Sequence, residues 1–147
     1  MWHRLKNLFF SFRVYNDLSP DLRVRQQVNR ALRDRPTLKQ DEWFESFYKS
    51  QGIAYPIAIF AYTYLEQYSG LKLGSILPTD RLEAELQWTA VCWFDWQQNL
   101  CKDFYRCFEI DIDIENGLAL SKLDTVGDLI VFLNCHWHPP TGTPTGR

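Results

Sequence analysis

Apolar residues recur at helical spacing through most of this 147-residue chain. The clearest repeat begins at Ile57, after which apolar side chains fall at i+3, i+4, i+7, i+8 and i+11, ending at Tyr68. That spacing gathers them on one face of an amphipathic helix. Pro56 suits the first turn of such a helix because its φ is fixed, and Gly70 suits the end because glycine tolerates the left-handed cap.

Two helices are expected before this one. Residues 19–21, Ser-Pro-Asp, have the composition of a helix start, with a capping hydroxyl, a proline and a first-turn carboxylate. The Arg-Pro pair at 35–36 ends that helix. Thr37 opens the next helix, with Gln40 three residues on as in a capping box, and Gly52 ends it. The apolar face of this second helix consists of Trp43, Phe44, Phe47 and Tyr48.

The second half of the chain predicts one long helix and one short one. The long helix covers Trp88 to Cys107. Its apolar side is formed by Trp93, Trp96, Leu100, Phe104 and Cys107. Residues 109–115 alternate charged residues with isoleucine, which indicates an extended segment or a short edge strand. Thr125 with Asp128 then caps the last helix.

Composition supports a packed core. Apolar residues make up 46% of the chain and aromatic residues 16%, which is too much apolar surface to leave in water. No internal repeat or second domain is apparent. We therefore predict an all-α fold, a compact helical bundle with extra N-terminal helices and at most one short edge strand. A single domain would cover residues 1–138, and residues 139–147 would form a flexible tail.

Charge is unevenly distributed. The net charge is −2, which argues against a general nucleic-acid binder. The first 35 residues nevertheless carry eight basic and three acidic side chains, whereas the remainder carries eight and fifteen. This basic head either binds an anionic partner or packs against its own acidic body.

The first 15 residues form a basic, aromatic arm. Its apolar residues fall on one helical face, with arginine and lysine around them. The pattern suits a helix that lies on a membrane surface, one that docks in a protein groove, or one that folds back on its own domain. The candidate partner-binding residues of this arm are Trp2, Arg4, Leu5, Phe9, Phe12 and Arg13.

Three stretches of the second half resemble acyl carrier proteins, and more closely the carrier-like bacterial proteins of unknown function related to them. They are DRLEAEL from Asp80, FEIDI from Phe108 and TVGDLIVFL from Thr125. The resemblance covers residues 57–137. It implies a first helix, a long loop, a long second helix, a short connecting segment and a final helix.

The attachment residue of carriers is missing. Carriers bind phosphopantetheine through a serine at the start of the second helix, within Asp-Ser-Leu. Counting forward from Leu86 puts Ala90 at that position, and counting back from Phe108 puts Phe94 there. Neither side chain can take the arm, and the nearest serines, at positions 75 and 121, lie outside the helix. The resemblance therefore implies a carrier-like scaffold without the carrier chemistry.

Other candidate chemistry is incomplete. Cys135, His136 and His138 are metal-ligand types, but no fourth ligand stands at a suitable spacing. Residues 111–117 resemble a calcium loop yet lack its sixth-position glycine and twelfth-position glutamate. A nucleophilic role for Cys92 or Cys101 needs a base, and all three histidines lie near the termini. We expect no catalytic residue, no metal and no cofactor.

These observations favour a non-enzymatic protein-binding or adaptor domain. Its partner would be another protein, with no nucleic acid, and a membrane surface is a possible partner of the arm. The alternatives are a genuine acyl or peptidyl carrier whose attachment site lies elsewhere, and a peripheral membrane protein that docks through residues 1–15. Neither a secretory signal nor a cysteine framework is apparent, so the expected location is cytoplasmic, with free thiols.

Overall fold

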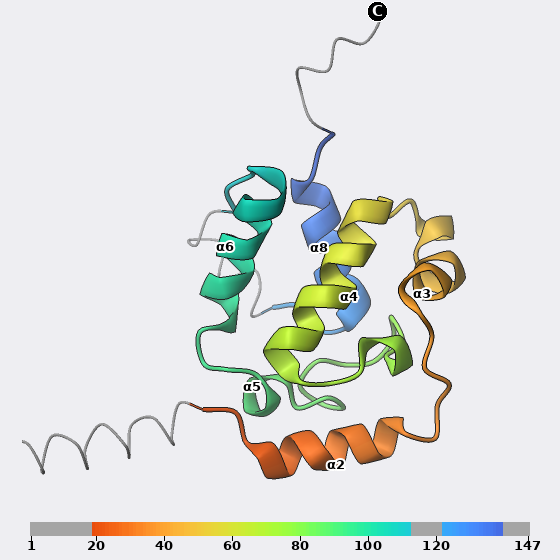
Figure 1. Cartoon of the computed structure of the whole chain (residues 1–147), viewed down its shortest axis with the longest axis vertical. Coiled ribbons are helices and arrows are strands. Elements are labelled where there is room, and N and C mark those ends of the chain that lie inside the picture. The colour runs from red at the N-terminus through yellow and green to blue at the C-terminus, as the bar shows by residue number, and fades with distance from the viewer. Residues whose placement is uncertain (1–18, 113–121, 140–147) are drawn as a thin grey trace, which may run out of the picture.

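The computed structural model describes residues 19–112 and 122–139, and it confirms the predicted all-α bundle (Figure 1). The α-helices of these residues are α2 (Leu22–Leu32), α3 (Gln40–Phe47), α4 (Tyr55–Ser69), α5 (Trp88–Val91), α6 (Trp96–Phe108) and α8 (Val126–His136). Two 3-10 turns, η1 (Lys49–Gln51) and η2 (Leu73–Ser75), lie in the connections.

Helix α4 is the centre of the bundle. It packs against α3, α6 and α8, while α2 runs across one end of the bundle and contacts α5 (Figure 1). The largest fully buried side chains come from α3, α4, α5, α6, α8 and the segments that connect them: Trp43, Tyr48, Ile57, Leu65, Leu71, Leu73, Ile76, Leu86, Trp88, Leu100, Phe104 and Leu129. One continuous apolar core therefore joins the N-terminal helices to the C-terminal ones.

The two helices with the clearest sequence signals are confirmed. Helix α4 has Pro56 in its first turn and ends at Gly70, which is left-handed with φ 69°. Helix α8 begins with the predicted capping box. The Thr125 hydroxyl accepts the N–H of Asp128 at 3.0 Å, and the Asp128 carboxylate accepts the N–H of Thr125 at 3.1 Å.

Two predicted caps are wrong. Asp21, and not Ser19, caps α2, because its carboxylate accepts the N–H groups of Arg23 and Val24. Thr37 does not cap α3, which begins three residues later. The cause is tertiary: Leu38 donates its N–H to the Gly74 carbonyl at 3.0 Å, which holds the linker extended beside η2.

The single long helix predicted over Trp88 to Cys107 is also wrong, because residues 92–95 separate α5 from α6. A continuous helix needs the carbonyls of Ala90 and Val91 for its own N–H groups four residues on. Here Asp21 donates its N–H to Ala90 at 2.9 Å, and Arg25 Nε donates to Val91 at 3.0 Å. Helix α2 therefore takes the acceptors that would have continued α5.

Of the two alternatives expected for residues 109–115, an extended segment or a short edge strand, the described residues 109–112 form no strand. Glu109 is left-handed with φ 57° and ends α6, and residues 110–112 are irregular. Ile112 is buried, as an inward isoleucine should be. The extended pairing within residues 19–112 and 122–139 is limited to one isolated bridge, between Arg81 and Thr125. The remainder of the predicted strand, residues 113–115, lies outside the described residues.

Candidate functional site

The six candidate partner-binding residues, Trp2, Arg4, Leu5, Phe9, Phe12 and Arg13, all lie outside the described residues, so their role stays a prediction. The same holds for Asp113, Glu115 and Ser121. The described residues contain the other candidates, and they also contain features that the sequence did not signal: a polar network, two clefts and an exposed face of α6.

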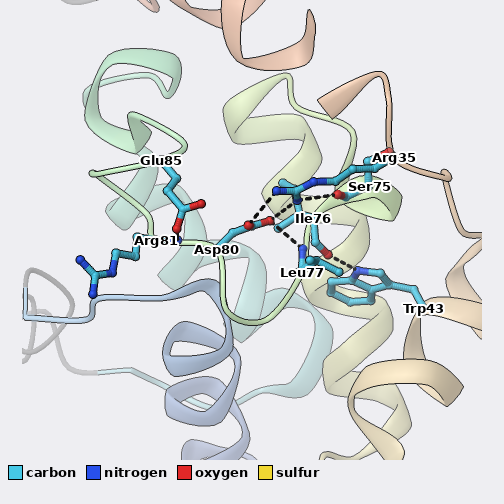
Figure 2. A network of polar contacts seen from close by, with 8 residues as sticks. All are labelled: Arg35, Trp43, Ser75, Ile76, Leu77, Asp80, Arg81 and Glu85. Carbon is cyan, nitrogen blue, oxygen red and sulfur yellow. Dashed lines mark hydrogen bonds and ion pairs between the residues drawn. The ribbon is translucent and has the colours of Figure 1, made fainter. Parts of the chain in front are cut away.

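A partly buried ion pair between Asp80 and Arg35 organises the loop from α4 to α5 (Figure 2). The Asp80 carboxylate accepts two hydrogen bonds from Arg35, at 2.5 Å from Nη1 and 3.1 Å from Nη2. It also accepts the N–H of Leu77 at 2.8 Å, while Nη1 of Arg35 donates to the Ser75 carbonyl. The hydrogen bonds that Arg35 donates to Asp80 raise the pKa of Arg35 above its usual value, so the guanidinium stays charged.

The same loop is held from its other side by aromatic residues. Trp43 Nε1 donates to the Ile76 carbonyl at 3.1 Å (Figure 2). The Tyr48 ring packs against Trp43 at a tilt of 54°, and its buried hydroxyl has no hydrogen-bond partner within the described residues. Burial raises the pKa of Tyr48, and the Asp80 carboxylate raises it further. Because both Asp80 oxygens already accept hydrogen bonds inside the chain, we interpret the network as structural.

A basic cleft opens between α2 and η2. It has a volume of about 390 Å³. Its lining residues are Asn29, Leu32, Arg33, Thr37, Lys72 and Ser75. Two of these residues are cationic and none is acidic, which is unusual for a chain of net charge −2. We call this feature the α2–η2 cleft.

A second cleft, of about 270 Å³, lies beside α5 and the start of α6. It is lined by Leu82, Glu83, Trp88, Thr89, Trp96, Gln97 and Leu123. Trp88 is almost fully buried, and its Nε1 has no hydrogen-bond partner in the described part of the chain. The Glu83 carboxylate is occupied by the backbone N–H and the hydroxyl of Thr89. The volume falls below the usual range of ligand pockets, so we assign this cleft no ligand.

The outward side of α6 combines polar and aromatic residues. Gln98, Lys102 and Tyr105 are exposed and spaced at i, i+4 and i+7, which places them on one side of the helix. Phe94 lies in the turn just before α6. Phe94 is 62% exposed and Tyr105 is 53% exposed, which is high for aromatic side chains. These four residues are called the α6 face below.

The candidate nucleophiles and metal ligands are not assembled into a site. Burial raises the pKa of Cys92, and it raises the pKa of Cys101 too, so both thiols are poor nucleophiles at neutral pH. His136 Nδ1 lies 2.9 Å from the Phe132 carbonyl oxygen of its own helix, and Cys135 is exposed. Within residues 19–112 and 122–139, no three histidine, cysteine or acidic side chains group closely enough to hold a metal.

No helix in the described part of the chain combines the length and apolarity of a membrane span. The sequence matches no protein-family model, and it is not significantly similar to any curated protein or solved structure. The function must therefore be argued from the residues themselves.

Proposed function

We propose that this chain is a non-enzymatic adaptor domain that binds another protein through the α6 face. The observation that carries the proposal is the exposure of Phe94 and Tyr105, at 62% and 53%. Aromatic side chains are enriched in the centres of protein interfaces, where they bury a large apolar area. Gln98 and Lys102 lie between them and supply polar contacts of the kind that surround such anchors.

The surface is compatible with docking because it is available and firmly supported. On its inner side α6 buries Leu100 and Phe104 completely. The Tyr68 hydroxyl donates to the Asp103 carboxylate at 2.6 Å, which ties α6 to α4. A rigid helix presents its exposed side chains with little loss of conformational entropy on binding, and this favours affinity.

The carrier-like arrangement is part of the same proposal. If α4 corresponds to the first carrier helix and α8 to the last, α6 corresponds to the second. Two residue counts were used above to locate the position of the carrier serine, one forward from Leu86 and one back from Phe108. The count back from Phe108 applies here, because residues 92–95 separate α5 from α6. That count follows α6 to Trp96 and ends in the turn just before this helix. Phe94 would then stand where a carrier has its attachment serine, and an aromatic side chain would replace a covalent arm as the contact with the partner.

Two of the serines, at positions 69 and 75, are buried and cannot take a prosthetic arm in the folded domain. Ser75 is 4% exposed, and its hydroxyl lies 2.9 Å from that of Thr37. The Ser69 hydroxyl is fully buried and donates to the Leu65 carbonyl at 2.7 Å. A transferase has no access to either oxygen in the folded domain.

The proposal is tested by site-specific photo-crosslinking in the cell that produces the protein. A benzophenone amino acid at position 94 should give a discrete cross-linked product, and the Tyr105→Ala substitution in the same chain should weaken it. The matched control places the same amino acid at Val131, which is 44% exposed on α8. Equal products from positions 94 and 131 would contradict a specific α6 face.

The carrier alternative is tested separately by intact-mass measurement. The full chain is incubated with a phosphopantetheinyl transferase and coenzyme A, beside a known carrier as the positive control. We expect no mass change. A gain of one phosphopantetheine on this chain would replace the adaptor proposal with a carrier function.

A further inference from the structure

We infer that the α2–η2 cleft is a binding site for the phosphate group of a small molecule. This site is distinct from the α6 face, and its residues play no part in the proposed adaptor contact. The cleft volume of about 390 Å³ lies within the range of small-molecule pockets, toward its lower end.

The charge of the cleft is the first reason. Arg33 and Lys72 both line it, and within the described residues neither cationic group has an ion-pair or hydrogen-bond partner. The nearby Arg35, by contrast, is neutralised by Asp80. Two like charges that face one concave surface repel each other, and an anion between them removes that repulsion.

The hydroxyl groups are the second reason. Thr37 Oγ1 and Ser75 Oγ lie 2.9 Å apart, so one donates its proton to the other. The hydroxyl that accepts keeps its own proton, for which the described part of the chain offers no acceptor. Ser75 is 4% exposed, so its hydroxyl lies at the depth of the cleft, whereas Thr37 is exposed. An anionic oxygen bound there would accept the remaining proton.

The rigidity of the walls is the third reason. The Asn29 side chain donates to the Gly70 carbonyl at 3.0 Å and accepts the Lys72 N–H at 3.3 Å. Asn29 is therefore a positioning residue that fixes Lys72 opposite α2. On the other side, Arg35 donates to the Ser75 carbonyl and fixes η2 to the end of α2. The backbone of both walls of the cleft is thus held in place before any ligand binds.

Phosphate fits this set of donors better than a carboxylate. A guanidinium, an ammonium and a hydroxyl reach the cleft from both walls, and a phosphate ester presents three free oxygens in different directions. A carboxylate has two oxygens in one plane. Leu32 supplies an apolar floor for the rest of a small ligand.

The test is a titration of the full chain with inorganic phosphate at low ionic strength, followed by amide chemical shifts. We expect saturable shifts at residues 33, 37, 72 and 75, with a dissociation constant on the order of 1 mM. Acetate at the same ionic strength should bind about tenfold more weakly. Absence of saturable shifts, or equal binding of acetate, would overturn the assignment of phosphate.

Charge-matched variants locate the site. The double substitution Arg33→Gln with Lys72→Gln should weaken phosphate binding by about tenfold or more. The control, Arg23→Gln with Lys49→Gln, removes the same charge from exposed positions outside the cleft and should stay within about twofold. Thr37→Val should weaken binding while acetate affinity stays unchanged. Equal losses in the two double variants would mean that net charge, and not this cleft, binds the anion.

A final binding experiment distinguishes a small-molecule ligand from a phosphorylated protein as the ligand of the cleft. Glycerol phosphate and a phosphoserine hexapeptide are compared on the full chain and on the Arg33→Gln, Lys72→Gln variant. We expect glycerol phosphate to bind at least as well as the peptide, because the cleft encloses little more than one small ligand. Clearly tighter binding of the peptide, lost in the variant, would overturn the small-molecule assignment.

Discussion

Removing the charge of Asp80 should destabilise the protein well beyond the loss of an ordinary surface ion pair. The Asp80→Asn substitution keeps the size of the side chain but turns one oxygen into a donor. That donor must then face either the Arg35 guanidinium or the Leu77 N–H, both of which are donors themselves. At least one buried hydrogen bond is lost, and a charged group loses its partner.

The magnitude follows from the exposure of the two partners. Breaking a fully buried pair costs about 3–5 kcal/mol. The Asp80 side chain is 4% exposed but that of Arg35 is 34% exposed, so water partly solvates the guanidinium that is left behind. We therefore expect a loss of about 2–3 kcal/mol in the free energy of unfolding. For a chain of this size that corresponds to a fall of about 5–10 °C in Tm.

The assay is urea unfolding followed by tryptophan fluorescence, with far-ultraviolet circular dichroism as a second probe. The matched control is Asp124→Asn, which removes the exposed Arg81–Asp124 pair at 3.6 Å and should cost less than about 0.5 kcal/mol. A double-mutant cycle with Arg35→Gln should give a coupling energy of at least about 1 kcal/mol. Equal losses for Asp80→Asn and Asp124→Asn, or no coupling, would refute the reasoning.

Four further predictions concern stability and burial. Gly74→Ala should cost about 1–3 kcal/mol by urea unfolding, because its Cβ would lie 2.2 Å from the Leu38 carbonyl oxygen. Gly52→Ala meets no atom within 4 Å and should cost only the strain of its positive φ, about 1 kcal/mol; a larger loss than for Gly74→Ala would contradict this. Tyr48→Phe removes a buried hydroxyl without a partner in the described residues, so the stability at pH 7 should stay equal or rise. Burial raises the pKa of Tyr48 and of Cys92 in the folded state, so the unfolded state loses these protons at a lower pH. The free energy of unfolding should therefore fall above about pH 9. The fall should be less steep in Tyr48→Phe, which lacks one of the two groups. Native thiol labelling should reach exposed Cys107 before Cys92, and equal rates would contradict the burial of Cys92.

The sequence predicted only single residues of the α6 face and nothing of the α2–η2 cleft. Phe94 was identified, but as one of two positions for a missing serine and not as an exposed aromatic. The α2–η2 cleft had no sequence signal, since Arg33 and Lys72 are 39 positions apart and each looks like an ordinary surface cation. Tertiary hydrogen bonds bring the two walls together, from Asn29 to residues 70 and 72 and from Arg35 to the Ser75 carbonyl.

Local sequence is sufficient to predict the helices whose ends are encoded by neighbouring residues. Helix α4 has its apolar repeat, Pro56 and the left-handed Gly70 within one continuous segment, and α8 has both halves of its capping box three residues apart. The tertiary structure alone decided where α5 ends. The Val91 carbonyl has two possible donors, its own helix and Arg25, and Arg25 lies 66 residues away. A local pattern cannot show which donor wins, because the outcome depends on how α2 packs across the end of the bundle.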